Sequence, residues 1–351
     1  MPDRRAVLKS IACAGAGAFM LSQVPFSAAQ TARRQVSIGG RRVKVVDIHA
    51  HCGFRAVEPV VRGTPQEYIE SDNRILGPHW LDWIDERGID IQVLSINRYW
   101  WYSAAEDLAR RITRVQDESL AEWCAQHSDR FVGLSSVSLQ HPELAAEQLD
   151  YAVKELGLRG ASIGGHVEGE APTTERFDPF WAKVEELGVP IFMHPDNAKN
   201  IDRTGVLQKA DFGGLIGNPL ETTLFLTQLI FDGTLDRFPG VKVVAAHGGG
   251  YLPSYLGRTQ ATCTRRSDAE CAKKPPSDYL KTQILADSMV FSDEGLRHLV
   301  AEMGASQIVY GTDLPFHWPD TLDLILDADY LTNEEKEAIV GGNLIKLLRI
   351  T

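Results

Sequence analysis

The sequence predicts an α/β fold, a single-domain (β/α)8 barrel of the TIM type. From residue 43 onward, short apolar runs alternate with longer amphipathic segments, and continuously apolar runs are typical of parallel strands buried on both faces. Eight runs occur, at residues 43–48, 90–96, 131–137, 160–163, 189–193, 241–246, 286–291 and 307–310. Eight strands that are each followed by a helix favour a barrel, with a doubly wound open sheet as the alternative. Polar residues gather where several runs end, and this favours the barrel.

The segments between the runs predict amphipathic helices. They cover residues 142–156, 180–187, 219–235 and 293–303, and a last helix is expected at 333–348. In the first of them Leu144, Leu149, Val153 and Leu156 fall on one side, which indicates the face that packs on the strands. Residues 199–217 and 262–276 are predicted as long loops that follow strands, and long loops in compact domains are often functional.

The first 29 residues resemble a targeting signal rather than a part of the fold. Arg4-Arg5 precedes a mildly apolar stretch, and Ser27-Ala28-Ala29 offers small residues for a signal peptidase. The layout resembles a bacterial twin-arginine signal; a membrane anchor or a chance basic start is the alternative. We therefore expect residues 1–29 to be removed, 30–42 to form an N-terminal extension and 43–351 to form the barrel. The mature protein is expected to be periplasmic or secreted, with no membrane contact.

The composition is that of a globular protein and argues against a nucleic-acid partner. Hydrophobic residues make up 44% of the 351 residues, enough for a large core. The net charge is −11, and the body of the chain holds no run of lysines or arginines. Binding to phosphate backbones needs such a basic surface.

Four cysteines remain once Cys13 leaves with the signal: Cys52, Cys124, Cys263 and Cys271. Their spacing matches no zinc-finger pattern. Cys263 and Cys271 fall in one polar segment, so a disulfide bond between them and two free thiols both remain open.

Five polar residues stand at the carboxyl ends of predicted strands. His49 and His51 end the first strand, and both can face one ion because side chains two apart on a strand point to the same side. His194 ends the fifth strand, His247 the sixth and Asp313 the eighth. Three neutral imidazoles and a carboxylate suit a divalent transition metal. We predict His49, His51, His194 and Asp313 as its ligands, with His247 as the general base or acid beside it.

Each of these residues alone has a structural explanation. An HxH pair is often incidental, a histidine at a strand end can belong to the core, and an aspartate after Gly-Thr can cap a helix. Their joint occurrence at the ends of four strands favours a reactive site.

The same residues and their context resemble the amidohydrolase superfamily, in particular its α-amino-β-carboxymuconate-ε-semialdehyde decarboxylase branch. The similarity runs from about residue 43 to the C-terminus. Its most specific stretches include Arg130-Phe131-Val132-Gly133-Leu134, Ile163-Gly164-Gly165-His166-Val167, Ala246-His247-Gly248-Gly249-Gly250 and Gly311-Thr312-Asp313-Leu314-Pro315-Phe316.

The resemblance implies one metal ion, most often zinc and in some branches manganese. It assigns the ligands to His49, His51, His194 and Asp313, and the catalytic base to His247. The end of the fourth strand carries no lysine, which agrees with a single ion. The resemblance also implies a homodimer in which Arg258 reaches into the neighbouring subunit's site.

The sequence departs from that branch around the substrate. The arginine expected ahead of the second strand is matched here by Trp80, and Arg98 is the candidate replacement. The loop 97–102 is rich in aromatic residues, and Trp100 is predicted to line a pocket for a flat ring, with packing at a helix start as the alternative. His166 is a candidate pocket residue, with a role in the core as the alternative.

The leading functional prediction is a decarboxylase, a carboxy-lyase that acts on a small unsaturated or aromatic carboxylate. His247 and Asp313 would manage the proton that replaces CO2. The alternative is a metal-dependent hydrolase of a lactone, ester or amide that uses the same residues, with Asp313 shuttling the proton. A non-catalytic binding barrel is a third hypothesis, against which the complete set of five residues argues.

Overall fold

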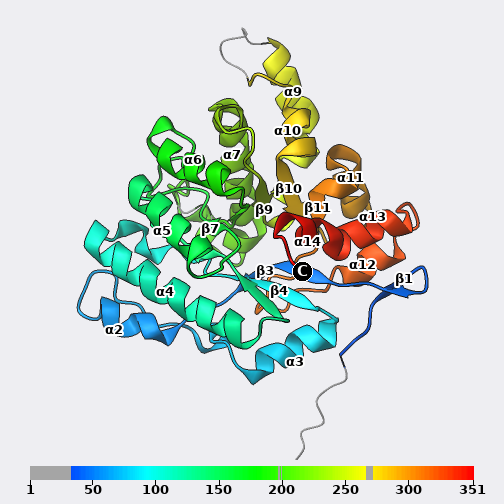
Figure 1. Ribbon diagram of the computed structural model, residues 1–351. Helices are drawn as coiled ribbons and strands as arrows, with labels where there is room; N and C mark the ends of the chain where they lie inside the picture. The colour runs from blue at the N-terminus through cyan, green and yellow to red at the C-terminus, as the bar shows by residue number, and fades with distance from the viewer. Residues whose placement is uncertain (1–32, 197, 199, 266–271) are drawn as a thin grey trace, which may run out of the picture. The chain divides into compact units, whose positions relative to one another are not determined.

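Parallel strands with helices packed around them make up the part of the chain that the structure describes (Figure 1). In this computed structural model the described residues are 33–196, 198, 200–265 and 272–351. The predicted signal, residues 1–29, lies outside them. The predicted extension forms a short antiparallel pair, β1 (Ser37–Ile38) and β2 (Arg41–Arg42).

Nine further strands within the described residues pair in parallel. They are β3 (Val46–His51), β4 (Ile91–Ser95), β5 (Phe131–Gly133), β6 (Ser135–Ser136), β7 (Ala161–Ile163), β8 (Ile191–Met193), β9 (Val243–Ala245), β10 (Ile284–Asp287) and β11 (Ile308–Val309). Strands β3 to β5 form one sheet and β6 to β11 form another, each in sequence order. Parallel neighbours joined through helices define the predicted α/β class.

Hydrogen bonds join the two sheets. The N–H of Leu134, between β5 and β6, donates to the carbonyl of Leu94 at 2.9 Å. The N–H of Ile48 on β3 donates to the carbonyl of Tyr310, which follows β11, at 3.1 Å. Strand pairing within the described residues stops short of a closed barrel.

Alternate strand residues form a shared apolar face. A buried cluster takes Val46 and Ile48 from β3 and Ile91 and Val93 from β4. Its other buried members are Leu134, Phe192, Val244, Ala246, Leu285, Val309, Leu344 and Leu348. Because side chains two apart on a strand share a face, one side of successive strands faces this cluster, and the other side packs against the helices.

The helices lie outside the strands (Figure 1). They are α2 (Glu58–Val61), α3 (Pro78–Arg87), α4 (Glu106–Gln126), α5 (Pro142–Lys154), α6 (Asp178–Leu187), α7 (Asn218–Phe231), α8 (Thr234–Arg237), α9 (Leu256–Arg265), α10 (Pro276–Thr282), α11 (Asp293–Met303), α12 (Leu322–Asp327), α13 (Asn333–Glu337) and α14 (Asn343–Leu347). Side chains fix some of their starts. Ser292 accepts a hydrogen bond from the N–H of Gly295 at the start of α11, and Thr332 and Glu335 form a capping box at α13.

Several predicted helices differ from the observed ones at glycines. The segment 219–235 is divided into α7 and α8 at Gly233, whose φ of 74° does not continue a helix. The closing helix, expected at 333–348, contains a π-helical turn, Ala338–Gly342, between α13 and α14. Gly341 in this turn packs against the backbone just before β3. A Cβ added at this glycine would come within 2.2 Å of the Lys44 carbonyl oxygen.

The predicted bounds of one strand and one loop are wrong. The seventh strand, expected at 286–291, is β10 and ends at Asp287. The apolar residues Met289 to Phe291 continue the pattern beyond the strand, but they lie in the loop that follows it, where Phe291 is exposed. The loop expected at 262–276 begins as helix, because α9 extends to Arg265.

Asp117 is a buried carboxylate that ties α4 to β6. Its Oδ1 accepts the N–H of Ser136 at 2.7 Å, and its Oδ2 accepts the hydroxyl of Ser135. Burial raises the pKa of Asp117 to about 7, and the two hydrogen bonds offset this only in part. The folded protein therefore keeps this proton at pH values where the unfolded chain has lost it.

We expect Asp117→Asn to change the pH dependence of stability. As pH rises from about 4 to about 7, the wild-type protein loses stability through Asp117, because ionisation is easier in the unfolded chain. Asparagine can keep both hydrogen bonds and does not titrate. Urea unfolding at pH 5 and pH 8 should show the variant gaining stability relative to wild type at the higher pH.

The control for this prediction is Asp107→Asn, which changes an exposed aspartate in the first turn of the same helix. It should follow the wild-type pH dependence. An equal difference between Asp117→Asn and wild type at both pH values would contradict the account of Asp117.

Candidate metal centre

The five residues predicted from strand ends come together in the structure. His49 and His51 lie on β3, and His194 directly follows β8. His247 lies two residues beyond β9, and Asp313 lies in the segment after β11. Because parallel strands bring their carboxyl ends to one edge, all five reach a common region.

Four of the five form a buried cluster with metal-ligand chemistry. In His49, His51, His194 and Asp313, one nitrogen or oxygen from each residue lies within 4.8 Å of the others. The Nε2 atoms of His49 and His51 lie 3.1 Å and 2.7 Å from Asp313 Oδ1. The fifth residue, His247, has its Nε2 3.8 Å from Asp313 Oδ2.

The polar atoms of this cluster fit a bound cation. His49 Nε2, His51 Nε2 and Asp313 Oδ1 are buried and have no hydrogen-bond partner among the described residues, although they lie close together. Hydrogen bonds require a suitable angle as well as a short distance. Buried polar atoms rarely stay unsatisfied, and lone pairs that converge without bonding one another are what a divalent ion requires.

The protonation states are nearly those that a metal needs. Burial lowers the pKa of His51 to about 4 and holds the pKa of His194 well below its usual value, so both are neutral at pH 7. The pKa of Asp313 is also low, because the charge of His49 and the close approach of the neighbouring histidines to its carboxylate outweigh its burial. His49 differs: although burial lowers its pKa, Asp313 and Asp287 raise it to about 10. Only His49 must therefore lose a proton before an ion binds.

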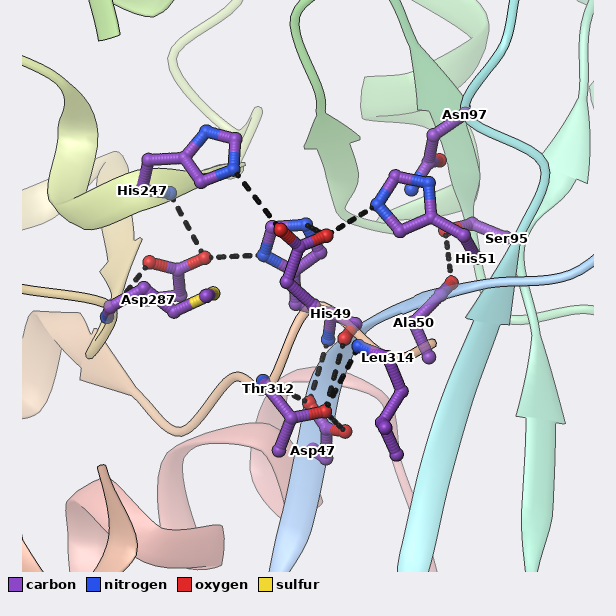
Figure 2. Close-up of polar contacts among 12 residues, drawn as sticks. Asp47, His49, Ala50, His51, Ser95, Asn97, His247, Asp287, Thr312 and Leu314 are labelled. Atoms are coloured by element: carbon purple, nitrogen blue, oxygen red, sulfur yellow. Dashed lines mark hydrogen bonds and ion pairs between the residues drawn. The ribbon is translucent and has the colours of Figure 1, made fainter. Parts of the chain in front are cut away.

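Asp47 holds the first and last strands of the site together (Figure 2). Its carboxylate accepts the N–H of His49 at 2.9 Å, the Thr312 hydroxyl at 2.6 Å and the Gln92 amide at 2.7 Å. Burial raises its pKa to about 6. The network joins the backbone at His49 to the backbone next to Asp313. It does not contact the side-chain atoms that would bind the ion.

Glu221 holds the loop that follows His194. It lies in the first turn of α7 and is 3% exposed. Its carboxylate accepts the N–H groups of Gly165 at 3.2 Å, Asp196 at 3.0 Å and Ala198 at 2.8 Å. Burial raises its pKa to about 7. The helix start therefore carries a carboxylate that joins the ends of β7 and β8.

The turn that carries His247 has an unusual backbone. His247 has a φ of 56°, and Gly248, Gly249 and Gly250 follow with φ values of 63°, 73° and 64°. A left-handed histidine is strained, whereas glycine adopts this region freely. An added Cβ at Gly248 would lie 2.6 Å from a methyl group of Val290. The glycines that follow His247 are thus required by the turn itself.

A cavity of about 1100 Å³ opens onto the cluster. His51, His194 and Asp313 line one part of it. Two arginines, Arg74 and Arg98, also line it, together with Asn97, Phe316, Trp318 and a series of residues from Leu207 to Asn218. The candidate ligands are therefore accessible to a small molecule from one side.

Trp80, the residue that matches the arginine of the related branch, does not line the cavity. Trp80 on α3 is fully buried in the core, where its Nε1 donates a hydrogen bond to Gln92 at 2.6 Å. Arg74, six residues earlier, lines the cavity instead. It is only 4% exposed, and its guanidinium makes no hydrogen bond or ion pair within the described residues. The guanidinium of Arg74 lies over the Phe316 ring, whose centroid is 5.5 Å away.

Of the four residues predicted to bind substrate, one lines the cavity and three do not. Arg98 lines the cavity, and its role in substrate binding stays a prediction. Trp100 stacks on Tyr68, at 4.9 Å between ring centroids, and does not line the cavity. His166 is half-buried, and its Nδ1 accepts the N–H of Gly169 at 3.2 Å. Arg258 is exposed on α9, and its role in a neighbouring subunit's site stays a prediction.

Two predictions from the sequence concern parts away from this site. Cys263 is disulfide-bonded, whereas Cys271 lies outside the described residues. Cys52 and Cys124 are free. Among the described helices, none combines the length and the apolar character that crossing a bilayer demands. Export stays a prediction.

A buried cluster of three histidines and an aspartate at the ends of parallel strands defines a class of metal-dependent enzymes. Comparison with known proteins gives the family. Residues 102–350 match the family model described as amidohydrolase, and the chain belongs to this amidohydrolase family.

Individual relatives are decarboxylases. The chain is 32% identical over 309 residues to 2-amino-3-carboxymuconate-6-semialdehyde decarboxylase of Dictyostelium discoideum, which covers 86% of this chain and 84% of the relative. It is 32% identical over 281 residues to gamma-resorcylate decarboxylase of Rhodococcus jostii, covering 76% and 85%. Among solved structures, 5-carboxyvanillate decarboxylase of Novosphingobium aromaticivorans, in complex with manganese and 4-hydroxy-3-methoxy-5-nitrobenzoic acid, superimposes with a TM-score of 0.77 at 22% identity, covering 88% and 96%.

Sequence reasoning missed three residues of the site: Arg74, Asn97 and Asp287. Asp287 ends β10 and carries the same signal as the five residues that were found, but the strand was expected to continue to residue 291. Asn97 follows β4 and was noted only as a part of the aromatic loop. Arg74 ends a 3-10 helix of one turn, which is too short for any periodic pattern to predict that its side chain faces the cavity.

We expect Gly248→Ala to impair catalysis while sparing metal binding. The added Cβ meets Val290 at 2.6 Å, and left-handed alanine adds strain of about 1–3 kcal/mol, so the turn shifts and moves His247. The rate constant kcat should fall about tenfold or more, whereas the metal content measured after purification should stay unchanged.

The control is Gly257→Ala on α9, where an added Cβ meets nothing within 4 Å. It should retain wild-type activity. If Gly248→Ala were as active as this control, the geometry of the turn would not matter for catalysis.

Proposed function

We propose that this protein is a mononuclear metal-dependent decarboxylase of a small aromatic or unsaturated carboxylate. The observation that carries the proposal is a buried guanidinium, Arg74, that forms no ion pair with a carboxylate of the described residues and lines the same cavity as the His/Asp cluster. A buried, unpaired positive charge is costly unless a ligand supplies the negative charge. Two relatives that are each 32% identical to this chain are named as decarboxylases, and they support the same conclusion.

The cavity offers hydrogen-bond donors for the carboxylate of a substrate and for a further oxygen atom of the same molecule. Arg74 provides a planar guanidinium that suits a carboxylate. Asn97 is 2% exposed, and its Oδ1 accepts the hydroxyl of Ser162 at 2.6 Å. That bond leaves the Asn97 Nδ2 as a buried donor with no partner among the described residues. Arg98 adds a second positive charge to the cavity wall.

Aromatic side chains favour a flat substrate. Phe316 lies between the Arg74 guanidinium and the His51 ring, with its centroid 5.2 Å from that of His51. Phe316 and Trp318 are both about half exposed and line the cavity. Rings presented in this way suit an aromatic or conjugated carboxylate.

The metal in this proposal is a divalent ion, Zn²⁺ or Mn²⁺, held by His49, His51, His194 and Asp313. When bound, it supplies positive charge that stabilises negative charge on substrate oxygens. Nitrogen and carboxylate donors suit both ions, and the solved relative that contains manganese supports the second.

The remaining chemistry belongs to the chain's own residues. Arg74 and Asn97 orient the carboxylate, and the low-polarity cavity wall formed by Phe316 and Trp318 limits access of water. The carbon–carboxylate bond breaks, its electron pair stays on the carbon, and CO2 leaves. His247 is placed to deliver the proton that forms the new carbon–hydrogen bond, with Asp313 3.8 Å from its Nε2 to stabilise the imidazolium.

The scaffold that we propose for this site is a closed (β/α)8 barrel. The hydrogen bonds from Leu134 to Leu94 and from Ile48 to Tyr310 support closure, as does a parallel bridge between Ala50 and Leu314. The apolar cluster of alternate strand residues supports it further, because a closed barrel is filled from all its strands.

The test of the proposed function is a product assay with the metal-loaded protein. Benzoates and muconates labelled at the carboxyl carbon should release labelled CO2, and a reaction in D2O should place one deuterium on the carbon that lost the carboxylate. Lactones, esters and amides serve as the comparison set. Acid release from these, with no CO2 from any carboxylate, would make the protein a hydrolase and overturn the proposal.

Arg74→Met should weaken substrate binding and leave the structure and the metal site intact. It removes the buried positive charge but keeps an unbranched side chain of similar length. A charged hydrogen bond contributes about 1.5–3 kcal/mol, so kcat/KM should fall about tenfold to a hundredfold, without change in metal content. Steady-state kinetics and metal analysis on the same preparation provide the measurement.

Arg74→Lys is the matched variant, because it keeps the charge and loses the bidentate geometry. Its kcat/KM should lie between those of wild type and Arg74→Met. Wild-type kinetics in Arg74→Met would remove Arg74 from the substrate site.

A further inference from the structure

Asp287 contacts both parts of the candidate centre, although the proposed chemistry does not use it. The residue ends β10 and is fully buried. Its Oδ2 accepts the ring Nδ1–H of His49 at 2.7 Å and the backbone N–H of His247 at 3.0 Å. Its Oδ1 accepts the N–H groups of Gly248 at 2.8 Å and Met289 at 3.2 Å. Figure 2 shows this carboxylate between His49 and the His247 turn.

A glycine in the segment after β11 allows this contact. Asp287 belongs to β10 and His49 to β3, and the chain after β11 passes between them. At Gly311 an added Cβ would lie 3.0 Å from the Asp287 Cβ and 3.1 Å from the His49 Cβ. Any larger residue at this position would therefore force the two side chains apart.

The bond to Asp287 decides which nitrogen of His49 carries a proton. A carboxylate that accepts at Nδ1 holds the proton there and leaves the Nε2 lone pair for the ion. His49 is the one ligand histidine with a carboxylate at its remote nitrogen within the described residues; both ring nitrogens of His51 and the Nδ1 of His194 have no hydrogen-bond partner there. The orientation of His49 thus depends on Asp287.

The same carboxylate stabilises the strained turn of the proton donor. His247 and Gly248 have φ values of 56° and 63°, and their N–H groups both point to Asp287. Hydrogen bonds to a buried charged acceptor are stronger than bonds between neutral groups. They can therefore offset the strain of a left-handed histidine.

We infer that Asp287 is a positioning residue that couples metal binding to the placement of His247. One carboxylate presents the Nε2 of His49 to the ion and fixes the turn from which His247 faces Asp313. This inference rests on the proposed function for the roles of the ion and of His247. Asp287 itself touches neither the substrate cavity nor the cluster's free ligand atoms.

An amide cannot replace this carboxylate. Asp287 accepts from four N–H groups, which is the full capacity of an ionised carboxyl group. Asparagine has one accepting oxygen, and its NH2 group faces two of the four donors whichever way the amide is turned. Asp287→Asn therefore disturbs the His49 tautomer, the His247 turn, or both in alternation.

The experiment compares wild type, Asp287→Asn and Asp117→Asn. Affinity of the metal-free proteins for Zn²⁺ and Mn²⁺ is measured by competition with a chromophoric chelator, and kcat is measured separately at saturating metal. In Asp287→Asn the metal Kd should rise about 10-fold to 100-fold, and kcat at saturating metal should still fall at least tenfold. Asp117→Asn, an equally buried substitution remote from the cluster, should keep both values.

The outcomes separate this inference from the proposed function. A wild-type protein that binds no stoichiometric metal would end the proposed function and this inference with it. A wild-type protein that binds metal, with Asp287→Asn unchanged in either metal Kd or kcat at saturating metal, would overturn the coupling alone.

A second measurement covers the case in which Asp287→Asn does not fold. In the zinc-loaded wild-type protein, long-range ¹H–¹⁵N spectra of the histidine rings report which nitrogen binds the ion. His49 should carry its proton on Nδ1 and bind zinc through Nε2. Coordination of His49 through Nδ1 would contradict the role of Asp287 without any mutation.

Discussion

The site depends on one electrostatic constraint: three imidazoles and a carboxylate are buried together with their lone pairs facing one another. The four ligand atoms lie within 4.8 Å, and several have no hydrogen-bond partner among the described residues. Such an arrangement is unfavourable unless a cation occupies its centre. The surrounding structure keeps these groups from rearranging, since Asp47 fixes the backbone, Asp287 fixes one ring and Glu221 fixes the loop after His194.

The pKa values of these three supporting carboxyl groups are shifted in different directions. Burial raises the pKa of Asp47 and Glu221, to about 6 and about 7, and the hydrogen bonds that each carboxylate accepts offset this only in part. Burial also acts on Asp287, but the hydrogen bond and charge of His49 outweigh it and keep its pKa low. The one supporting carboxylate that stays fully ionised is therefore the one in contact with a ligand ring. This charge is available to balance part of the charge of the ion.

Local sequence rules predicted most of the fold and the cluster. Continuous apolar runs located the strands, and the residue at the end of each run lies at the shared edge, so His49, His51, His194, His247 and Asp313 could be found together. The same rule failed for Asp287 only because Met289 to Phe291 extend the apolar pattern beyond the end of β10.

Residues in irregular segments could not be predicted in this way. Arg74 reaches the cavity because its backbone is held against the segment that follows β3. There the N–H of Gly53 donates to the Arg74 carbonyl at 3.0 Å. No periodic pattern encodes that long-range contact. The resemblance to relatives gave no indication of Arg74 either, because the position of the branch's arginine is occupied by Trp80, which the α3 packing buries. Trp100 is only two residues from Arg98, which lines the cavity, but its ring stacks on Tyr68 and does not line the cavity.

The most direct test of the central claim is calorimetric titration of the metal-free protein with Zn²⁺ at pH 7 in buffers of different ionisation enthalpy. The pKa of His49 near 10 means that the metal-free cluster holds one proton that an ion must displace. We predict one ion per chain and release of about one proton per ion bound, a release that is lost in His49→Gln. Binding of no stoichiometric ion would contradict the account of a cluster built around a cation, whereas stoichiometric binding without proton release would contradict only the raised pKa of His49.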